Sequence, residues 1–185
     1  VISRKVKKGT NDFLLKPAMS EREAMQAVRV GMELVKECKE AGYTLLGTGE
    51  MGIGNTTTSA AMAAALLSVP PEIVAGRGAG LSDEGLVRKR QVIAAALEKY
   101  QLRETEPMRI LCSVGGLDIA GLCGVFLGGA KYHMPIVADG VISAVAALTA
   151  ERLCPGTKEF IIPSHKGKEP ASELLMRELG LSPVL

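Results

Sequence analysis

The sequence predicts an α/β protein, with three α/β/α layers built around a mostly parallel sheet that helices cover on both faces. Short apolar runs alternate along the chain with longer segments of helical periodicity, the pattern expected of βαβ units. These runs are continuous rather than alternating with polar residues, as in strands buried on both faces. The chain has 185 residues, of which 47% are hydrophobic, which is enough to bury one core. We therefore expect a single domain over residues 1–185.

Four apolar runs are expected to form strands, over residues 43–46, 109–114, 135–138 and 160–162. Helices are expected over the segments near 21–41, 55–69, 83–101, after 118, 141–152 and 169–179. Two of the helix starts have recognisable caps. Ser20 and Glu23 have the spacing of a capping box, and Ser82 is expected to cap the helix near 83–101. The alternation of strands and helices predicts a Rossmann-like sheet.

Composition argues against several classes of partner. The formal net charge is +2, aromatic residues make up 3% and there is no tryptophan, so we expect no nucleic acid partner. We find no long apolar stretch and no leader pattern, so we expect no membrane association. The four cysteines form no C-x-x-C pair, which favours thiols in a reducing cytoplasm. The two histidines lie outside ligand motifs, so neither a metal nor a cofactor is expected.

Glycine-rich turns follow all four predicted strands, and each turn carries polar side chains. These side chains include Glu50, Asp118, Asp139 and Ser164. In open α/β sheets, ligands bind beyond the carboxyl ends of the strands, so the four turns predict one polar site. The alternative for Asp118 and Asp139 is that each one only caps a helix.

The glycine loop over residues 47–54 is the most informative segment. It matches G-x-G-x-x-G, but the acidic strand end that dinucleotide sites place about twenty residues later is missing. It also matches a Walker A pattern in which Asn55 replaces the lysine, so a triphosphate would lack its main cation. A glycine loop that opens a helix still offers N–H donors suited to a single phosphate. Arg77 and Lys89 are the candidate cations.

Five motifs occur in a fixed order along the chain. They are Gly49-Glu-Met-Gly-Ile-Gly-Asn-Thr-Thr57, Gly76-Arg-Gly-Ala-Gly-Leu-Ser-Asp-Glu-Gly85 followed by Lys89, Gly115-Gly-Leu-Asp-Ile-Ala-Gly121, Asp139-Gly-Val-Ile-Ser-Ala144 and Pro163-Ser-His165. From about residue 18 to residue 181, the chain closely resembles the nicotinate-nucleotide–dimethylbenzimidazole phosphoribosyltransferases of cobalamin biosynthesis.

The resemblance implies transfer of a 5-phosphoribosyl group from nicotinate mononucleotide to 5,6-dimethylbenzimidazole, which gives α-ribazole 5′-phosphate and nicotinate. It also implies a homodimer and no metal. The phosphate is expected on the backbone of Gly52 and Gly78, with Lys89 as its cation and Ser164 as a further donor. Glu50 and its loop are expected beside the ribose and nicotinate. The remaining residues of the implied substrate-binding set are Gly54, Asn55, Thr56, Asp118 and Asp139.

The general base of the resembled family is a glutamate in a Gly-Glu-Gly-Thr-Gly-Ala stretch, which does not occur up to Leu185. The family's N-terminal portion, which supplies much of the benzimidazole pocket, is also not found. We therefore expect a nucleotide-binding core that binds nucleotide but turns it over poorly, with no certain catalytic residue. One alternative is a non-catalytic nucleotide-binding module. A P-loop ATPase is a third interpretation, which Asn55 opposes.

Overall fold

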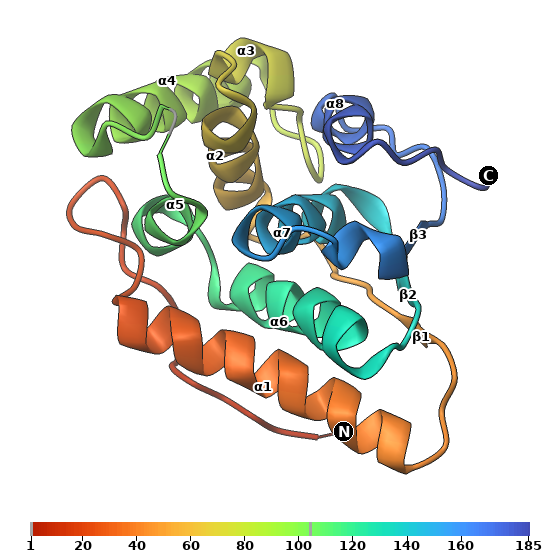
Figure 1. Cartoon of the computed structure of the whole chain (residues 1–185). Coiled ribbons are helices and arrows are strands. Elements are labelled where there is room, and N and C mark those ends of the chain that lie inside the picture. The colour runs from red at the N-terminus through yellow and green to blue at the C-terminus, as the bar shows by residue number, and fades with distance from the viewer. Residues whose placement is uncertain (1, 104) are drawn as a thin grey trace.

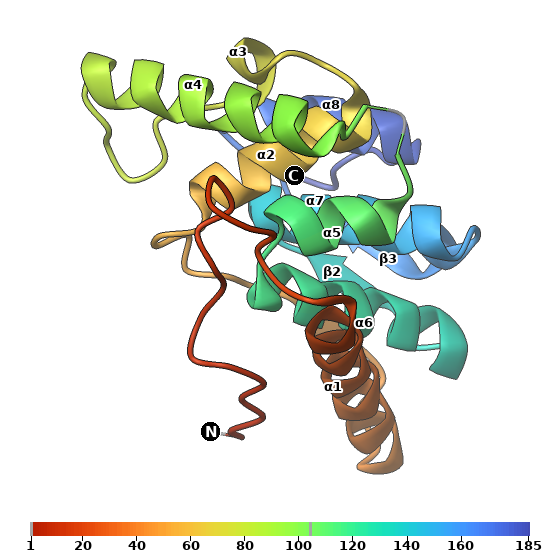
Figure 2. The same cartoon turned by 90° about the vertical axis from the view of Figure 1, so that its left-hand side faces the viewer.

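The computed structural model describes residues 2–103 and 105–185 (Figures 1 and 2). The helices are α1 (Glu21–Glu40), α2 (Thr56–Leu67), α3 (Pro71–Val74), α4 (Asp83–Tyr100), α5 (Pro107–Val114), α6 (Leu117–Tyr132), α7 (Gly140–Leu153), the 3-10 helix η1 (Thr157–Phe160) and α8 (Ala171–Leu179). The strands are β1 (Leu46–Gly47), β2 (Ile136–Ala138) and β3 (Ile161–Pro163). The predicted α/β class is confirmed. None of the described helices has the length and apolar character needed to cross a bilayer.

The strands form one parallel sheet in the order β1-β2-β3. Ile136 of β2 pairs with Leu46 on one side and with Ile161 on the other, so these three side chains share a face. Ile136 and Ile161 are buried, and α6 approaches this face closely at Gly129, where a Cβ would lie 2.6 Å from Ile136 Cγ1. The opposite face carries Ile162, which is 38% exposed. The sheet is therefore tightly covered on the α6 face and open at Ile162.

The strand predicted over residues 109–114 is wrong, because that segment forms α5. The helix begins at Pro107, whose fixed φ and missing N–H suit the first helical position. Its buried side chains include Ile110, Leu111 and Val114, which have the spacing of one helical face. A short apolar run does not distinguish a buried strand from such a face, and Pro107 was the signal that sequence reasoning missed.

Two other predicted strands are displaced toward the C-terminus. The strand expected over residues 43–46 is observed at Leu46–Gly47, and Tyr43 is 60% exposed. Pairing with β2 begins only when the N–H of Leu46 donates to the carbonyl of Pro135 at 3.1 Å. The strand expected over residues 160–162 is observed one residue later, because η1 occupies the chain before it.

The two predicted helix caps are confirmed. At α1 the N–H of Glu23 donates to Ser20 Oγ at 3.3 Å, and the N–H of Ser20 donates to Glu23 Oε2 at 2.9 Å. At α4 the N–H of Gly85 donates to Ser82 Oγ at 3.1 Å. These bonds satisfy N–H groups that have no partner within the helix, so they define where each helix begins.

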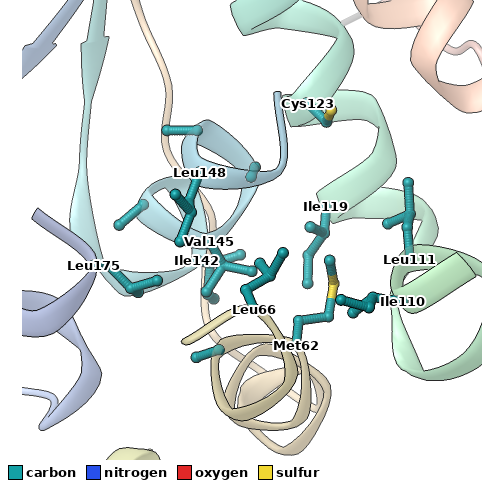
Figure 3. Packing of buried hydrophobic residues seen from close by; sticks show 14 of the residues in the cluster. Met62, Leu66, Ile110, Leu111, Ile119, Cys123, Ile142, Val145, Leu148 and Leu175 are labelled. Carbon is teal, nitrogen blue, oxygen red and sulfur yellow. The ribbon is translucent and has the colours of Figure 1, made fainter. Parts of the chain in front are cut away.

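Helices α2 and α7 lie in the centre of the apolar core (Figure 3). Residues 60–66 of α2 and 142–150 of α7 are all buried. Met62 points toward Ile119 of α6, while Leu66 points toward α7. Because these two helices are fixed on all sides, the segments at their N-terminal ends start from a rigid support.

Helices α1 and α6 lie side by side in Figure 1, and glycines on both helices allow their backbones to approach very closely. A Cβ added at Gly124 would overlap the carbonyl oxygen of Val28 and would lie 2.7 Å from its carbonyl carbon. A Cβ added at Gly31 would overlap the carbonyl oxygen of Gly121 and would lie 2.7 Å from the N of Val125. The two backbones therefore approach to a distance that only glycine permits at these positions.

We expect Gly124→Ala to lower the free energy of unfolding by about 2–3 kcal/mol, because the new methyl group forces the helices apart. Gly121→Ala is the matched control in the same helix, because its Cβ would meet its nearest neighbour, the carbonyl oxygen of Ala27, at 4.0 Å. We expect the control to be neutral or to stabilise the protein by up to about 1 kcal/mol through helix propensity. Urea unfolding of both variants measures this. Equal stabilities would contradict the close crossing.

Candidate active site

The loop after β1 starts from an anchored residue. Thr48 is buried, and its N–H donates to the carbonyl of Val137 at 2.8 Å. Its hydroxyl contacts the same carbonyl at 3.0 Å and Ser143 Oγ at 3.1 Å, which ties the loop to β2 and α7. Beyond this anchor, Gly52 and Gly54 have φ angles of +77° and +79°, a conformation that other residues rarely adopt. The loop is thus fixed at its base and turns sharply above it.

Glu50 folds back onto its own loop. Its Oε2 accepts a hydrogen bond from the N–H of Gly52, one of the two backbone groups predicted to bind a phosphate. The N–H of Gly52 can therefore bind an anionic oxygen, because it already donates to the carboxylate of Glu50. A phosphate placed on Gly52 would replace the carboxylate, because the N–H has a single hydrogen to donate.

Asn55 occupies the N-cap position of α2, but its side chain makes no capping bond. Its Nδ2 instead donates to Oδ2 of Asp118 at 2.6 Å. Asp118 lies in the first turn of α6, after α5, so the expectation that it follows a strand is wrong. Its carboxylate acts on the site by holding Asn55 in place. The backbone N–H groups at the start of α2 are consequently left without a side-chain cap, as an anion site requires.

Lys89 of α4 brings a cation to the start of α2. Its side chain is only 4% exposed, and Nζ donates to the carbonyl of Gly76 at 3.0 Å and to Thr56 Oγ1 at 3.2 Å. Burial removes water from the charged form and lowers the pKa of Lys89, while the charge of Glu169 acts in the opposite direction. One ammonium group therefore joins the second glycine loop, residues 76–80, to α2, in the part of the site where Asn55 replaces a Walker A lysine.

The second glycine loop packs directly on α2. Gly78 has a φ of +55°, and a Cβ there would lie 2.8 Å from Thr56 Oγ1. Both the backbone conformation and the lack of space for a side chain therefore favour glycine at this position. Arg77, the other candidate cation, forms an ion pair with Asp83 and donates to the carbonyl of Leu81 at 2.9 Å. Arg77 thus stabilises the loop, and Lys89 is the cation that lies between this loop and the start of α2.

Asp139 and Ser164 follow β2 and β3, so the parallel sheet brings them together as predicted. The Ser164 hydroxyl lies 3.5 Å from Asp139 Oδ1, at the long limit of a hydrogen bond. His165, the next residue of the same predicted turn, has its Nδ1 3.0 Å from Ser164 Oγ and 3.3 Å from Asp139 Oδ1. Asp139 also faces the first glycine loop, because a Cβ at Gly49 would lie 4.0 Å from Asp139 Oδ2.

These segments enclose a cleft of about 330 Å³. The predicted residues that line it are Glu50, Gly52, Thr56, Gly78 and Asp139. Glu169, which no sequence motif singled out, lines it as well. Lys89 reaches this cleft through its contact with Thr56. The cleft therefore combines backbone N–H groups and one buried cation with several carboxylates, a combination suited to a phosphate bonded to a hydroxylated group.

Residues 1–185 match a family model described as "Phosphoribosyltransferase". The chain belongs to this phosphoribosyltransferase family. The family predicted from the motifs is thereby confirmed.

Similar phosphoribosyltransferases extend well beyond this chain. Nicotinate-nucleotide–dimethylbenzimidazole phosphoribosyltransferase from Acetivibrio thermocellus is 48% identical over the whole chain, which covers 53% of that protein. The same-named protein of Clostridium perfringens strain ATCC 13124 is 46% identical, with 51% of it covered. The crystal structure of CobT from Thermus thermophilus has a TM-score of 0.94 and 40% identity, and the chain covers 55% of it. The chain spans about half the length of the curated relatives it matches.

Five predicted residues do not line this main cleft of the candidate site, namely Gly54, Asn55, Lys89, Asp118 and Ser164. Gly54 lines an adjoining cleft of about 360 Å³, which shares Gly52 and Thr56 with the main one. Asp118 accepts a hydrogen bond from Asn55, and the hydroxyl of Ser164 contacts Asp139, which lines the cleft. Within residues 2–103 and 105–185, no group of three or more His, Cys, Asp or Glu side chains is placed to hold a metal ion.

We expect Asp118→Ala to loosen the first glycine loop, because the Asn55 amide loses its partner. The lost bond predicts faster amide hydrogen exchange over residues 52–57 and a decrease of about 1–2 kcal/mol in the free energy of unfolding. Glu84→Ala is the control, since it also removes an exposed acid from the first turn of a helix. We expect it to leave exchange over residues 52–57 unchanged. An equal effect of the two variants would contradict the positioning role of Asp118.

Proposed function

We propose that this chain is the phosphate- and ribose-binding core of an enzyme that transfers a 5-phosphoribosyl group from nicotinate mononucleotide to 5,6-dimethylbenzimidazole. The observation that carries the proposal is the buried ammonium of Lys89 between the second glycine loop and the start of α2. One cation among backbone N–H donors fits a single phosphate better than a triphosphate chain. The names of the similar proteins supply the nucleotide and the acceptor base.

The carboxylates of the cleft fit the sugar of such a substrate. Ribose hydroxyl groups donate hydrogen bonds, and Glu50 and Asp139 are acceptors that line the same cleft as Gly52 and Gly78. In the transfer, the bond from the ribose C1′ to the nicotinate nitrogen breaks, and a bond from C1′ to a benzimidazole nitrogen forms. Nearby carboxylates stabilise the positive charge that develops on the ribose ring. The core thus positions the ribose and balances its charge.

The incoming benzimidazole also loses a proton, for which a general base is required. We assign this role to none of the described residues, so we expect this chain to bind the nucleotide and to release nicotinate only slowly when the acceptor base is present. A non-catalytic binding module would behave in the same way in a binding assay. Supplying dimethylbenzimidazole and measuring nicotinate release separates the two, because only an enzyme couples release to the acceptor base.

We further infer a homodimer in a reducing cytoplasm. All four cysteines are free, and burial raises the pKa of the Cys123 thiol to about 12 and that of Cys112 to about 11, so both are poor nucleophiles. Unpaired thiols of this kind are typical of a reducing compartment. The dimer follows from the family resemblance and is tested by sedimentation of the purified chain.

We expect Lys89→Met to weaken the binding of nicotinate mononucleotide by about 10- to 100-fold, because the phosphate loses a charge-assisted hydrogen bond. Arg88→Met is the matched control, since it removes the same charge from the adjacent, exposed position of α4. We expect the control to change the affinity by less than about twofold. Isothermal titration of the folded variants measures both. No binding heat with the unmodified chain, or equal loss in the two variants, would overturn the proposed function.

A further inference from the structure

Glu169 is placed against the same backbone that holds Lys89. It lies in the loop between β3 and α8, and its carbonyl accepts a hydrogen bond from the N–H of Ser172 at 3.0 Å. A Cβ added at Gly76 would overlap Oε2 of Glu169 and would lie 2.9 Å from Cδ of Pro170. The carboxylate thus rests directly over the Gly76 peptide, whose carbonyl is the acceptor of the Lys89 ammonium.

Lys89 needs an anion that its direct partners do not provide. The ammonium is buried, and both of its hydrogen-bond partners, Gly76 O and Thr56 Oγ1, are uncharged oxygens. A buried charge is costly unless an opposite charge compensates it. Glu169 is the acid whose charge acts on Lys89, and it favours the protonated ammonium against the effect of burial. Its position over Gly76 therefore has an electrostatic consequence as well as a packing one.

A bound phosphate would bring a second anion to this position. Glu169 lines the cleft together with Gly52 and Gly78, the two glycines whose N–H groups are proposed to hold the phosphate. A carboxylate and a phosphate in one small cleft repel each other, and both are attracted to the same ammonium. Only one of them can be the principal counter-ion of Lys89.

We propose that Glu169 is the resident counter-ion of the phosphate site, which balances Lys89 while the site is empty and opposes the phosphate when it binds. The inference rests on the proposed function, because it takes the cleft to be a phosphate site. Glu169 is a positioning residue in this account, since it acts through Lys89.

The test is isothermal titration of the 185-residue chain with inorganic phosphate at low ionic strength. Glu169→Gln keeps the shape of the side chain and removes its charge, so we expect phosphate to bind roughly fivefold more tightly. Glu169→Asp retains the charge and is expected to remain within about twofold of the original chain. A gain of affinity is the deciding readout, because damage to a purely structural contact weakens binding.

Glu173→Gln is the matched control for the change in net charge. Glu173 lies in the first turn of α8, is exposed, and pairs with Lys166 and Arg177 rather than facing the cleft. We expect this variant to bind phosphate within about twofold of the original chain at the same ionic strength. A gain equal to that of Glu169→Gln would show a general charge effect and would overturn the proposal.

Lys89→Met in the same titration separates failure of the counter-ion role from failure of the proposed function. If Lys89→Met weakens phosphate binding and Glu169→Gln leaves it unchanged or weakens it, the phosphate site stands and the counter-ion role is wrong. If Lys89→Met has no effect, the cleft is not a phosphate site and both proposals fail. If Lys89→Met weakens binding while Glu169→Gln strengthens it, both are supported.

Discussion

A single buried ammonium joins a glycine loop to the start of a helix that precedes it in the sequence. Lys89 donates to the carbonyl of Gly76 and to the hydroxyl of Thr56, so the second glycine loop and the start of α2 are held at a fixed separation. The helix that carries Lys89 begins at the Ser82 cap. Removing water from a lysine is unfavourable, so this arrangement persists only because the surrounding fold holds it. The cap, the loop and the packing of α4 therefore all contribute to placing one positive charge.

The sheet contributes the other half of the cleft. A parallel sheet places the ends of its strands at a common edge, which is how Asp139 and Ser164 come together from β2 and β3. Thr48 fastens the first glycine loop to the same edge through its bonds to Val137 and Ser143. The cleft is thus assembled from two rigid parts, the sheet edge and the α2–α4 pair. Its shape is determined by the core between them rather than by the loops alone.

Local signals in the sequence predicted the parts of the fold that depend on neighbouring residues. The capping box at Ser20 and the cap at Ser82 were readable because each bond spans only a few positions. The helix over 107–114 was mistaken for a strand, because its apolar residues fit both structures. Because of that error, Asp118 was expected at the end of a strand, whereas it follows a helix and its carboxylate accepts a hydrogen bond from Asn55.

Contacts between distant segments were only partly predictable. Glu50 and Asp139 were expected in one place because each follows a predicted strand, and Gly52 and Gly78 were expected there from the resemblance to the family. All four line the cleft. Glu169 lies in a loop without a motif, and its role depends on where the chain passes over Gly76. No pattern in the sequence of that loop predicts that Glu169 packs against Gly76. The resemblance to the family pointed to the substrate. Only the geometry revealed Glu169, the acid that is proposed to compete with a bound phosphate for Lys89.

Acids of the same chain act on three donor groups at the cleft. Glu50 accepts a hydrogen bond from the N–H of Gly52, and Asp139 lies 3.5 Å from the Ser164 hydroxyl. The charge of Glu169 acts on Lys89, whose hydrogen-bond acceptors are Gly76 and Thr56. Leaving such donors buried and unpaired would be costly, so the carboxylates stabilise the site before any ligand arrives. A phosphate therefore exchanges one set of anionic oxygens for another, and its affinity reflects the difference between them. A neutral ligand makes that exchange poorly, because it cannot replace the charge that it displaces, whereas a phosphate with two negative charges can. Selection for the phosphate thus comes from the acids of the cleft as well as from its cation.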